Sequence, residues 1–336
     1  MKSAMQRQAA ALLLGTILGT SMTPVVAANA HPLTLDTRIP LGDVSGRIDH
    51  LAFDAARKRI YVAELGNGSV GVVDLTARRV VRTISGFEEP QGIAYDPGTD
   101  VIYIANGGDG SVALLSGADL SVIRVISLGK DADNVRIDPA THRVFVGYGD
   151  GALAVIDPAT HERIANIPLA GHPESFQLDP ASATVFVNVP SARQIAIVSR
   201  ETNEQIGAWP TGKLRSNYPL VFDAVHSRVI SVFRRPARLQ AYAPDSGQSL
   251  GGSETCSDSD DIFVDAKRLQ AHVICGEGFV DTFEASGDDF TRIGRFTTSA
   301  GSRTGLFVPQ LDRLIVAVRA NDGEPAALWV LQPGPH

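Results

Sequence analysis

Polar side chains that could bind a ligand recur at a fixed distance before a series of regularly spaced marker residues. The marker residues end short apolar, β-branched runs, and they are Asp54, Asp96, Asp138, Asp179, Asp223, Asp265 and Pro309. Five positions before them stand Asp49, Gln91, Asp133, Glu174, Tyr218, Asp260 and Thr304, with His50, Asn134, Asp261 and Arg303 directly beside this set. Carboxylate, amide, imidazole and guanidinium groups gathered at one place could hold a divalent cation or bind a polar small molecule.

Three interpretations of these residues stay open. They could do no more than solvate the ends of strands, because loop residues are generally polar. They could form the binding face of a non-catalytic scaffold, which is the favoured interpretation. In the alternative, a lactonase-like hydrolase, Asp49, Asn134, Glu174 and Asp260 hold a divalent cation that polarises a carbonyl or a water, with His50 as acid or base.

Known catalytic and cofactor motifs are missing from the sequence. It contains no G-x-S-x-G, no phosphate-binding P-loop, no H-E-x-x-H and no C-x-x-C-H. No cofactor is therefore predicted, and a divalent cation belongs only to the hydrolase alternative.

The elements that must position these residues are short strands in a repeated order. The marker residues are 41 to 44 positions apart. After the marker Asp54, for example, come a second strand at 60–63, a Gly-rich turn at 66–68, a third strand at 70–73 and a fourth at 80–84. Four antiparallel strands per unit are typical of one propeller blade, so seven units predict an all-β, seven-bladed β-propeller domain over residues 31–336.

The seventh unit lacks its fourth strand, because the chain ends soon after a third strand at 328–331. A spare apolar segment at 33–41 precedes the first unit. Pairing this N-terminal strand with the C-terminal blade would close the ring and remove an exposed edge. Pro40 is tolerated on such an outermost strand.

Residues 1–30 have the three-part form of a signal peptide. Lys2 and Arg7 give a positive start, an apolar run follows at 9–18, and small residues allow cleavage after Ala27 or Ala30. The apolar run is too short to span a membrane. We therefore predict export to the periplasm or the medium.

The composition limits the range of partners. The net charge is −7, which argues against nucleic acid as a partner. The expected partners are an unidentified small molecule or a periplasmic protein, and a closed ring is expected to be a monomer.

Cys256 and Cys275 are the two cysteines of the chain. In the predicted topology both lie on the same face of blade 6, one before its first strand and one at the end of its second. In an exported protein they are expected to form a disulfide, which would stabilise the fold by about 3 kcal/mol and fix the loop that carries Asp258, Asp260 and Asp261. A redox pair or a thiolate metal site is disfavoured because there is no C-x-x-C spacing.

Two segments resemble the repeat signature of YVTN-type, YncE-like bacterial β-propellers. They are Tyr-Val-Ala-Glu followed by Gly-Asn-Gly-Ser-Val at 61–70, and Tyr-Ile-Ala-Asn-Gly-Gly-Asp-Gly-Ser-Val at 103–112. Segments at 46–52, at 260–263 together with 275–278, and at 303–309 look like stretches of an exported subgroup of that family. The resemblance implies a propeller over essentially the whole of 31–336, and it carries over no shared catalytic signature, so the catalytic residues stay unknown. The fifth unit departs from it, because Phe-Arg-Arg-Pro-Ala-Arg at 233–238 replaces the Gly-rich turn.

Overall fold

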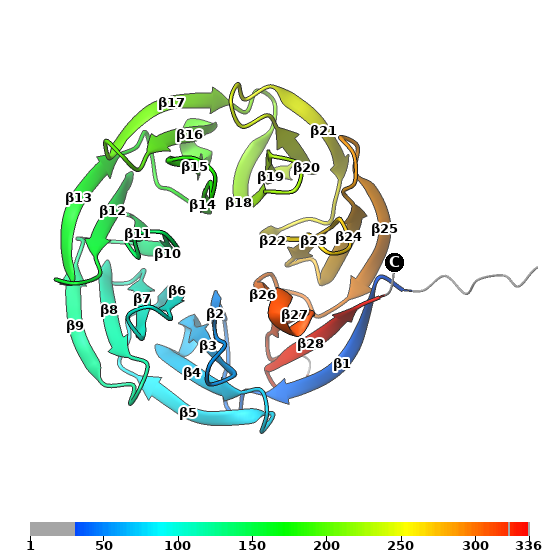
Figure 1. Cartoon of the computed structure of the whole chain (residues 1–336). Coiled ribbons are helices and arrows are strands. Elements are labelled where there is room, and N and C mark those ends of the chain that lie inside the picture. Colours follow the sequence, from blue (N-terminus) through cyan, green and yellow to red (C-terminus); the bar gives the residue numbers. More distant parts are fainter. Residues whose placement is uncertain (1–30, 322, 335–336) are drawn as a thin grey trace, which may run out of the picture. The chain divides into compact units, whose positions relative to one another are not determined.

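The computed structural model describes residues 31–321 and 323–334, and the predicted signal peptide lies outside the described residues. The described chain forms seven antiparallel sheets of four strands each, arranged as blades around a central channel (Figure 1). The predicted seven-bladed β-propeller is confirmed. Within the described residues, no helix has the length and hydrophobicity needed to cross a bilayer.

The blades follow one another along the chain, and their strands have these bounds. Blade 1 comprises β2 (Leu51–Asp54), β3 (Arg59–Glu64), β4 (Ser69–Asp74) and β5 (Arg79–Ser85). Blade 2 comprises β6 (Pro90–Asp96), β7 (Val101–Asn106), β8 (Ser111–Ser116) and β9 (Val122–Ser127). Blade 3 comprises β10 (Ala132–Ile137), β11 (Val144–Tyr148), β12 (Ala152–Asp157) and β13 (Glu162–Pro168). Blade 4 comprises β14 (Phe176–Leu178), β15 (Thr184–Val189), β16 (Gln194–Ser199) and β17 (Glu204–Pro210).

The last three blades complete the ring. Blade 5 comprises β18 (Arg215–Asp223), β19 (Arg228–Arg235), β20 (Ala237–Tyr242) and β21 (Ser249–Glu254). Blade 6 comprises β22 (Ser259–Asp265), β23 (Gln270–Cys275), β24 (Phe279–Glu284) and β25 (Thr291–Thr297). Blade 7 comprises β26 (Gly305–Val308), β27 (Arg313–Val318), β28 (Ala327–Pro333) and β1 (Leu33–Pro40). Three 3-10 turns among the described residues, η1 (Leu65–Asn67), η2 (Pro190–Ala192) and η3 (Pro309–Leu311), lie between strands.

The burial of each strand follows from its place in the blade. Second strands pack against neighbouring blades on both faces, and all six residues of β7 are buried. Fourth strands form the outer wall, and β9 is exposed along almost its whole length. Aromatic and β-branched residues in the second strands meet the demand for two-sided burial, as their composition predicts.

The marker aspartates hold the turn between the first and second strands. Asp54 Oδ1 accepts the N–H of Arg57 at 2.9 Å, and Asp96 Oδ1 accepts the N–H of Gly98 at 3.0 Å. The same bond recurs at Asp138, Asp179, Asp223 and Asp265. These residues are therefore structural, because an Asp side chain that accepts backbone N–H groups stabilises such a turn.

The seventh marker is one residue earlier than the sequence predicts. Val308 pairs with Arg313 as Asp54 pairs with Arg59, so Val308 occupies the marker position and Pro309 begins η3. The prediction at Pro309 was wrong because no Asp marks this turn. Counting back from Val308 places Arg303, rather than Thr304, at the position equivalent to Asp49.

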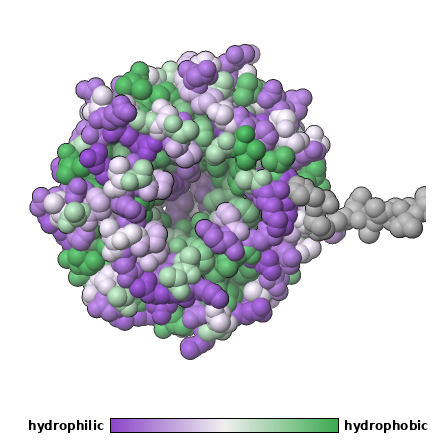
Figure 2. All heavy atoms as spheres, in the orientation of Figure 1, coloured by the Kyte–Doolittle hydropathy of each residue, from purple (hydrophilic) through white to green (hydrophobic). Residues whose placement is uncertain are grey.

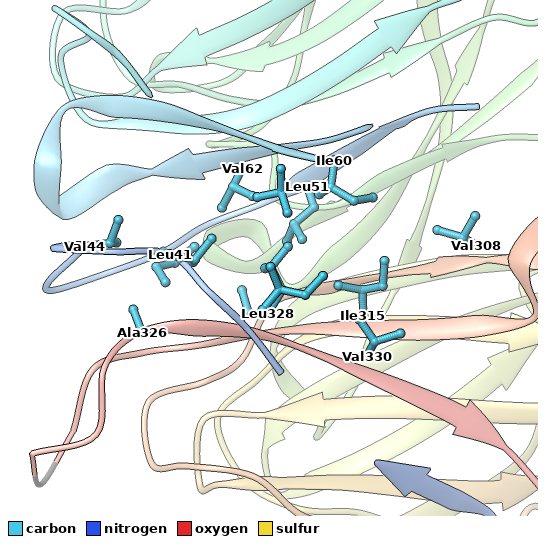
Figure 3. Close-up of a cluster of buried hydrophobic side chains, with 14 residues drawn as sticks. Leu41, Val44, Leu51, Ile60, Val62, Val308, Ile315, Ala326, Leu328 and Val330 are labelled. Atoms are coloured by element: carbon cyan, nitrogen blue, oxygen red, sulfur yellow. The ribbon is translucent and has the colours of Figure 1, made fainter. Parts of the chain in front are cut away.

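The N-terminal strand closes the ring as predicted. β1 pairs antiparallel with β28, and its Ile39 and Leu33 are 1% and 2% exposed. Ile39 belongs to a cluster of buried apolar side chains that joins blade 7 to blade 1 and includes Ile60, Ile315 and Leu328 (Figure 3). Strand β1, here called the latch, therefore contributes both backbone pairing with β28 and part of the apolar core.

Candidate functional site at the mouth of the central channel

The loops that lead into the innermost strands converge at one end of the channel, here called the mouth. Eight residues from five blades line a cavity there: Arg47, His50, Asp133, Asn134, Glu174, Ser175, Tyr218 and Asp260. Six of them belong to the set predicted from the sequence. The volume of the cavity is about 20 Å³, which is enough for one water molecule or for one small functional group of a ligand. Figure 2 shows the hollow at the centre of the ring.

Asp49 is fully buried between two cations. Its Oδ1 lies 2.7 Å from His50 Nδ1, and its Oδ2 lies 2.8 Å from Arg47 Nη2. Burial alone would raise the pKa of Asp49, but the contacts with His50 and Arg47 hold it below its ordinary value. Burial alone would lower the pKa of His50, but Asp49 and Asp261 raise it, so the imidazole carries a proton at neutral pH. His50 is therefore a charged partner of Asp49. Because its ring is protonated, it has no free nitrogen lone pair with which to act as a base.

Asp260 is held by an arginine from blade 5. Arg234 Nη2 lies 2.7 Å from Asp260 Oδ1, and Arg234 Nε donates to the carbonyl of Ser259 at 2.9 Å. The guanidinium also lies 3.8 Å from the centre of the Tyr218 ring, a cation–π contact. Burial and the charge of Asp49 raise the pKa of Asp260 to about 7, although Arg234 opposes this shift.

Arg234 and Arg47 were missed as site residues by the sequence reasoning. Arg234 lies in the segment that replaces the Gly-rich turn of blade 5, so the departure from the repeat was the signal for it. Arg47 precedes Asp49 by two residues, and nothing in the sequence marked it as a site residue. Counting five positions back from the marker selects only Asp49 and its immediate neighbours.

Arg303 was predicted and lies at the rim of the mouth. Its Nη2 is 3.1 Å from Asp258 Oδ2, and its Nε is 3.9 Å from Asp260 Oδ2. Asp258 also contacts Arg234 at 3.3 Å. Blades 5, 6 and 7 are thereby joined by one network of ion pairs.

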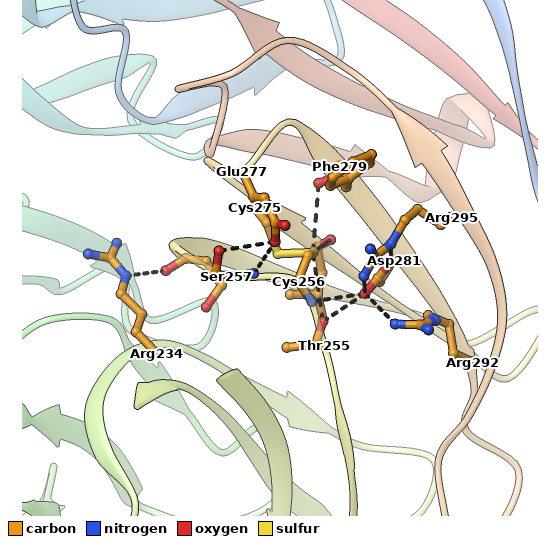
Figure 4. Close-up of a disulfide and its surroundings, with 12 residues drawn as sticks. Arg234, Thr255, Cys256, Ser257, Cys275, Glu277, Phe279, Asp281, Arg292 and Arg295 are labelled. Carbon is orange, nitrogen blue, oxygen red and sulfur yellow. Dashed lines mark hydrogen bonds and ion pairs between the residues drawn. A yellow bond between two sulfur atoms is a disulfide. The ribbon is translucent and has the colours of Figure 1, made fainter. Parts of the chain in front are cut away.

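The predicted disulfide is present and fixes the loop that carries Asp258 and Asp260. Cys256 and Cys275 are bonded, with 5.8 Å between their Cα atoms. The backbone N–H of Cys256 donates to the buried Asp281 at 2.9 Å, and Arg295 pairs with the same carboxylate at 2.6 Å (Figure 4). The loop is therefore held by a covalent bond and by a buried carboxylate.

Two acceptors at the mouth have no protein donor. Glu174 is half-buried, and no hydrogen bond or ion pair reaches its carboxyl group from any described residue. Asn134 Oδ1 is buried without a partner. Burial and the nearby charge of Asp133 raise the pKa of Glu174 to about 8, although His172 opposes the shift. Buried polar groups are normally paired, so Asn134 Oδ1 requires a donor from water or from a ligand. The half-buried Glu174 carboxyl beside it is open to the same partner.

The remaining predicted residues lie beside the cavity. The side chain of Gln91 lies against Gly107, in the turn after β7, rather than in the mouth cavity. Asp261 points into the channel, where its Oδ2 accepts the N–H of Gly305 at 2.8 Å. His172, from the loop before β14, lies 3.9 Å from Asp133 Oδ2.

The four predicted metal ligands do not form a cation site in this arrangement. Within residues 31–321 and 323–334, no three His, Cys, Asp or Glu side chains are grouped so as to hold a metal ion. Asp49 and Asp260 contact His50, Arg47 and Arg234 instead. A carboxylate already paired with a cation is a poor ligand for a divalent metal.

Comparison with known proteins supports the fold. No family model matches the chain, and no curated protein matches it in sequence. A chain in the crystal structure of the mitotic checkpoint complex has a TM-score of 0.77 at 10% identity, over 96% of this chain and 99% of that one. A chain of Kuenenia stuttgartiensis hydrazine synthase has a TM-score of 0.71 at 13% identity, over 94% of this chain and 99% of that one. At these identities the similarity shows a β-propeller and says nothing about activity.

Proposed function

We propose that this chain is an exported, YncE-like β-propeller that acts as a non-catalytic binding scaffold. Its ligand, a small polar molecule or a polar group of a periplasmic protein, binds at the mouth of the central channel. The YVTN-like repeats support the family, and the predicted signal peptide together with the disulfide supports export, since disulfides persist in oxidising compartments.

One observation carries the proposal: Glu174 and Asn134 line the mouth cavity, and no described residue donates to the Glu174 carboxyl or to the buried Asn134 Oδ1. The groups around them are fixed, because Asp49, Asp260 and Asp258 are each paired with arginine. A rigid ring with two unpaired acceptors suits a ligand that brings N–H or O–H donors. Preorganisation of this kind lowers the entropic cost of binding.

Thermal-shift measurements with a panel of sugars, amino acids and polyamines test the proposal. We expect at least one compound to raise the Tm of the wild-type protein and to lose that effect in Glu174→Leu. The matched control is Arg79→Gln, an exposed residue at the start of β5, at the far end of the blade from the mouth. A panel without any shift, or a shift that is equal in Glu174→Leu and the wild type, would contradict the proposal.

The alternative function, a metal-dependent lactonase-like hydrolase, stays a prediction. It requires Asp49 and Asp260 to exchange their present Arg and His partners for a cation that Asn134 and Glu174 also bind. Metal analysis of the purified protein tests it directly. A stoichiometric Ca²⁺ or Zn²⁺ that is lost in Asp260→Ala would favour the hydrolase over the scaffold.

A further inference from the structure

A second, larger cavity lies in the channel next to the mouth and is lined by the innermost strands. Its volume is about 310 Å³, within the range of small-molecule sites, and it is here called the chamber. Six of its lining residues stand two positions before the marker position of their blades: Ala52, Ala94, Arg136, Gln177, Phe263 and Leu306. Six of the seven innermost strands thus bring one side chain each to a common level of the channel, and β18 does not line the chamber.

Arg136 of β10 is the cation at this level. Its Nη1 donates to the carbonyl of Val135 at 2.9 Å, and its guanidinium lies 5.8 Å from the centre of the Phe176 ring. No carboxylate of the described residues lies within ion-pair distance of it, in contrast to Arg47, Arg234 and Arg303 at the mouth. A guanidinium has five donors, so most of those of Arg136 are left for another partner.

The nearest acid of the chamber is already engaged. Asp261 accepts the N–H of Gly305 at 2.8 Å, and its other oxygen lies 3.9 Å from the His50 ring. Since His50 carries a proton, it offsets the charge of Asp261. Arg136 therefore lines the chamber as a cation that has no direct ion pair with a described carboxylate, although the charges of Asp261 and Asp133 act on it from a distance.

The rest of the lining is mostly apolar. Apolar side chains such as Ala94, Phe263 and Leu306 give a hydrocarbon wall, and Gln177 adds a neutral amide. The other polar members of the lining are Tyr95, Asp261 and the protonated His50. An arginine that is free to pair forms bidentate bonds with carboxylates, which are stronger than neutral hydrogen bonds. The combination fits a molecule with one carboxylate and a compact apolar body.

We propose that the chamber is a binding site for a small organic carboxylate, with Arg136 as the residue that binds the carboxylate group. The chamber is too small for a folded partner, and the positive charges of Arg136 and His50 favour an anionic ligand over an amine. This site does not depend on binding at the mouth, because Glu174 and Asn134 do not line the chamber. Failure of either proposal leaves the other intact.

Fluorine NMR with para-fluorobenzoate as the probe tests the site on the purified protein. We expect saturable binding to the wild type and binding at least about tenfold weaker in Arg136→Gln, with Arg136→Lys in between. The neutral probe para-fluorobenzamide is expected to bind about tenfold more weakly than the carboxylate. Arg79→Gln, which also removes one exposed cation, is expected to bind like the wild type.

A second variant keeps the test decisive if Arg136→Gln fails to fold. Ala94→Leu fills part of the chamber and leaves Arg136 in place, so it is expected to lose probe binding. The proposal is overturned if the wild type shows no saturable binding, if Ala94→Leu binds as the wild type does, or if the benzamide binds as well as the benzoate. Loss of binding in Glu174→Leu would also overturn it, since the site would then be at the mouth.

Discussion

Glu174 is a half-buried acid beside Asp133 without a donor from the described residues, and this makes the stability of the protein depend on pH. Its pKa is raised from 4.5 to about 8, so the folded chain holds a proton there that the unfolded chain releases above pH 4.5. The stability from this proton is complete below pH 4.5 and is lost as the pH rises through 8. We expect Glu174→Gln to match the wild type near pH 5 and to be more stable by roughly 1–3 kcal/mol at pH 9, measured by urea unfolding.

The matched control for this pH dependence is Glu201→Gln, which changes an exposed acid in the turn between β16 and β17. Its stability relative to the wild type should not change with pH. A Glu174→Gln variant whose stability runs parallel to the wild type from pH 5 to pH 9 would show that Glu174 titrates normally.

Arg234 and Asp260 form a partly buried pair whose loss should be costly. Arg234→Ala leaves Asp260 without its nearest cation, and we expect a loss of about 2 kcal/mol in the free energy of unfolding at pH 8. The double variant Arg234→Ala with Asp260→Asn should recover part of that loss, because the unpaired charge is gone. Urea unfolding of the four proteins in this cycle measures the coupling. Additive effects of the two changes would mean that the pair contributes nothing.

Residue types in the sequence were enough to predict most of the mouth, and the errors have physical causes. Asp133, Glu174 and Asp260 were found because a fixed count from the marker aspartates selects one position at or just before the start of an innermost strand, and His50 was found next to the counted Asp49. The count failed where the marker is not an aspartate, at Val308. Contacts that depend on side-chain direction, such as the pairing of Arg234 with Asp260, have no periodic signal and required the structure.

At the scale of elements, the disulfide joins the loop before β22 to the end of β23. Its contribution to the free energy of unfolding can be measured separately. We expect the double variant Cys256→Ser and Cys275→Ser to lose about 3 kcal/mol in the free energy of unfolding, because the bond closes a loop over a separation of 19 residues. Guanidinium unfolding measures this loss. Dithiothreitol should weaken the wild type and leave the double variant unchanged, and equal stability of the two proteins without reductant would refute the prediction.

The order and number of strands were predictable from the sequence because each blade repeats the same burial pattern. Strands buried on both faces need runs of apolar β-branched residues, and the turns between them need residues that tolerate positive φ, such as Gly68 at +60°. The short turns η1, η2 and η3 were not predicted, because three-residue 3-10 turns have no periodicity of their own. Missing η1 and η2 did not change the predicted marker positions. At η3, Pro309 was taken as the marker in place of Val308, which shifted the predicted position in blade 7 by one residue.

At the scale of the whole molecule, the ring depends on the latch between β1 and β28, and this gives a test with an internal control. Ile39 is 1% exposed in the cluster that joins blade 7 to blade 1, whereas Leu35 of the same strand is 39% exposed. Ile39→Asp buries an unpaired charge, so we expect a loss of at least about 3 kcal/mol in the free energy of unfolding. Leu35→Asp should change it by less than about 1 kcal/mol. Guanidinium unfolding of both variants measures the difference.

Release of the latch should also change the state of association. A free β28 would present an unpaired edge that can pair with another chain, whereas the closed ring hides it. We therefore expect the wild type and Leu35→Asp to sediment as monomers, and Ile39→Asp to form larger species in proportion to its concentration. Monomeric Ile39→Asp with wild-type stability would mean that the β1 pairing is dispensable, and the ring would then have to be held by the contacts between blades alone.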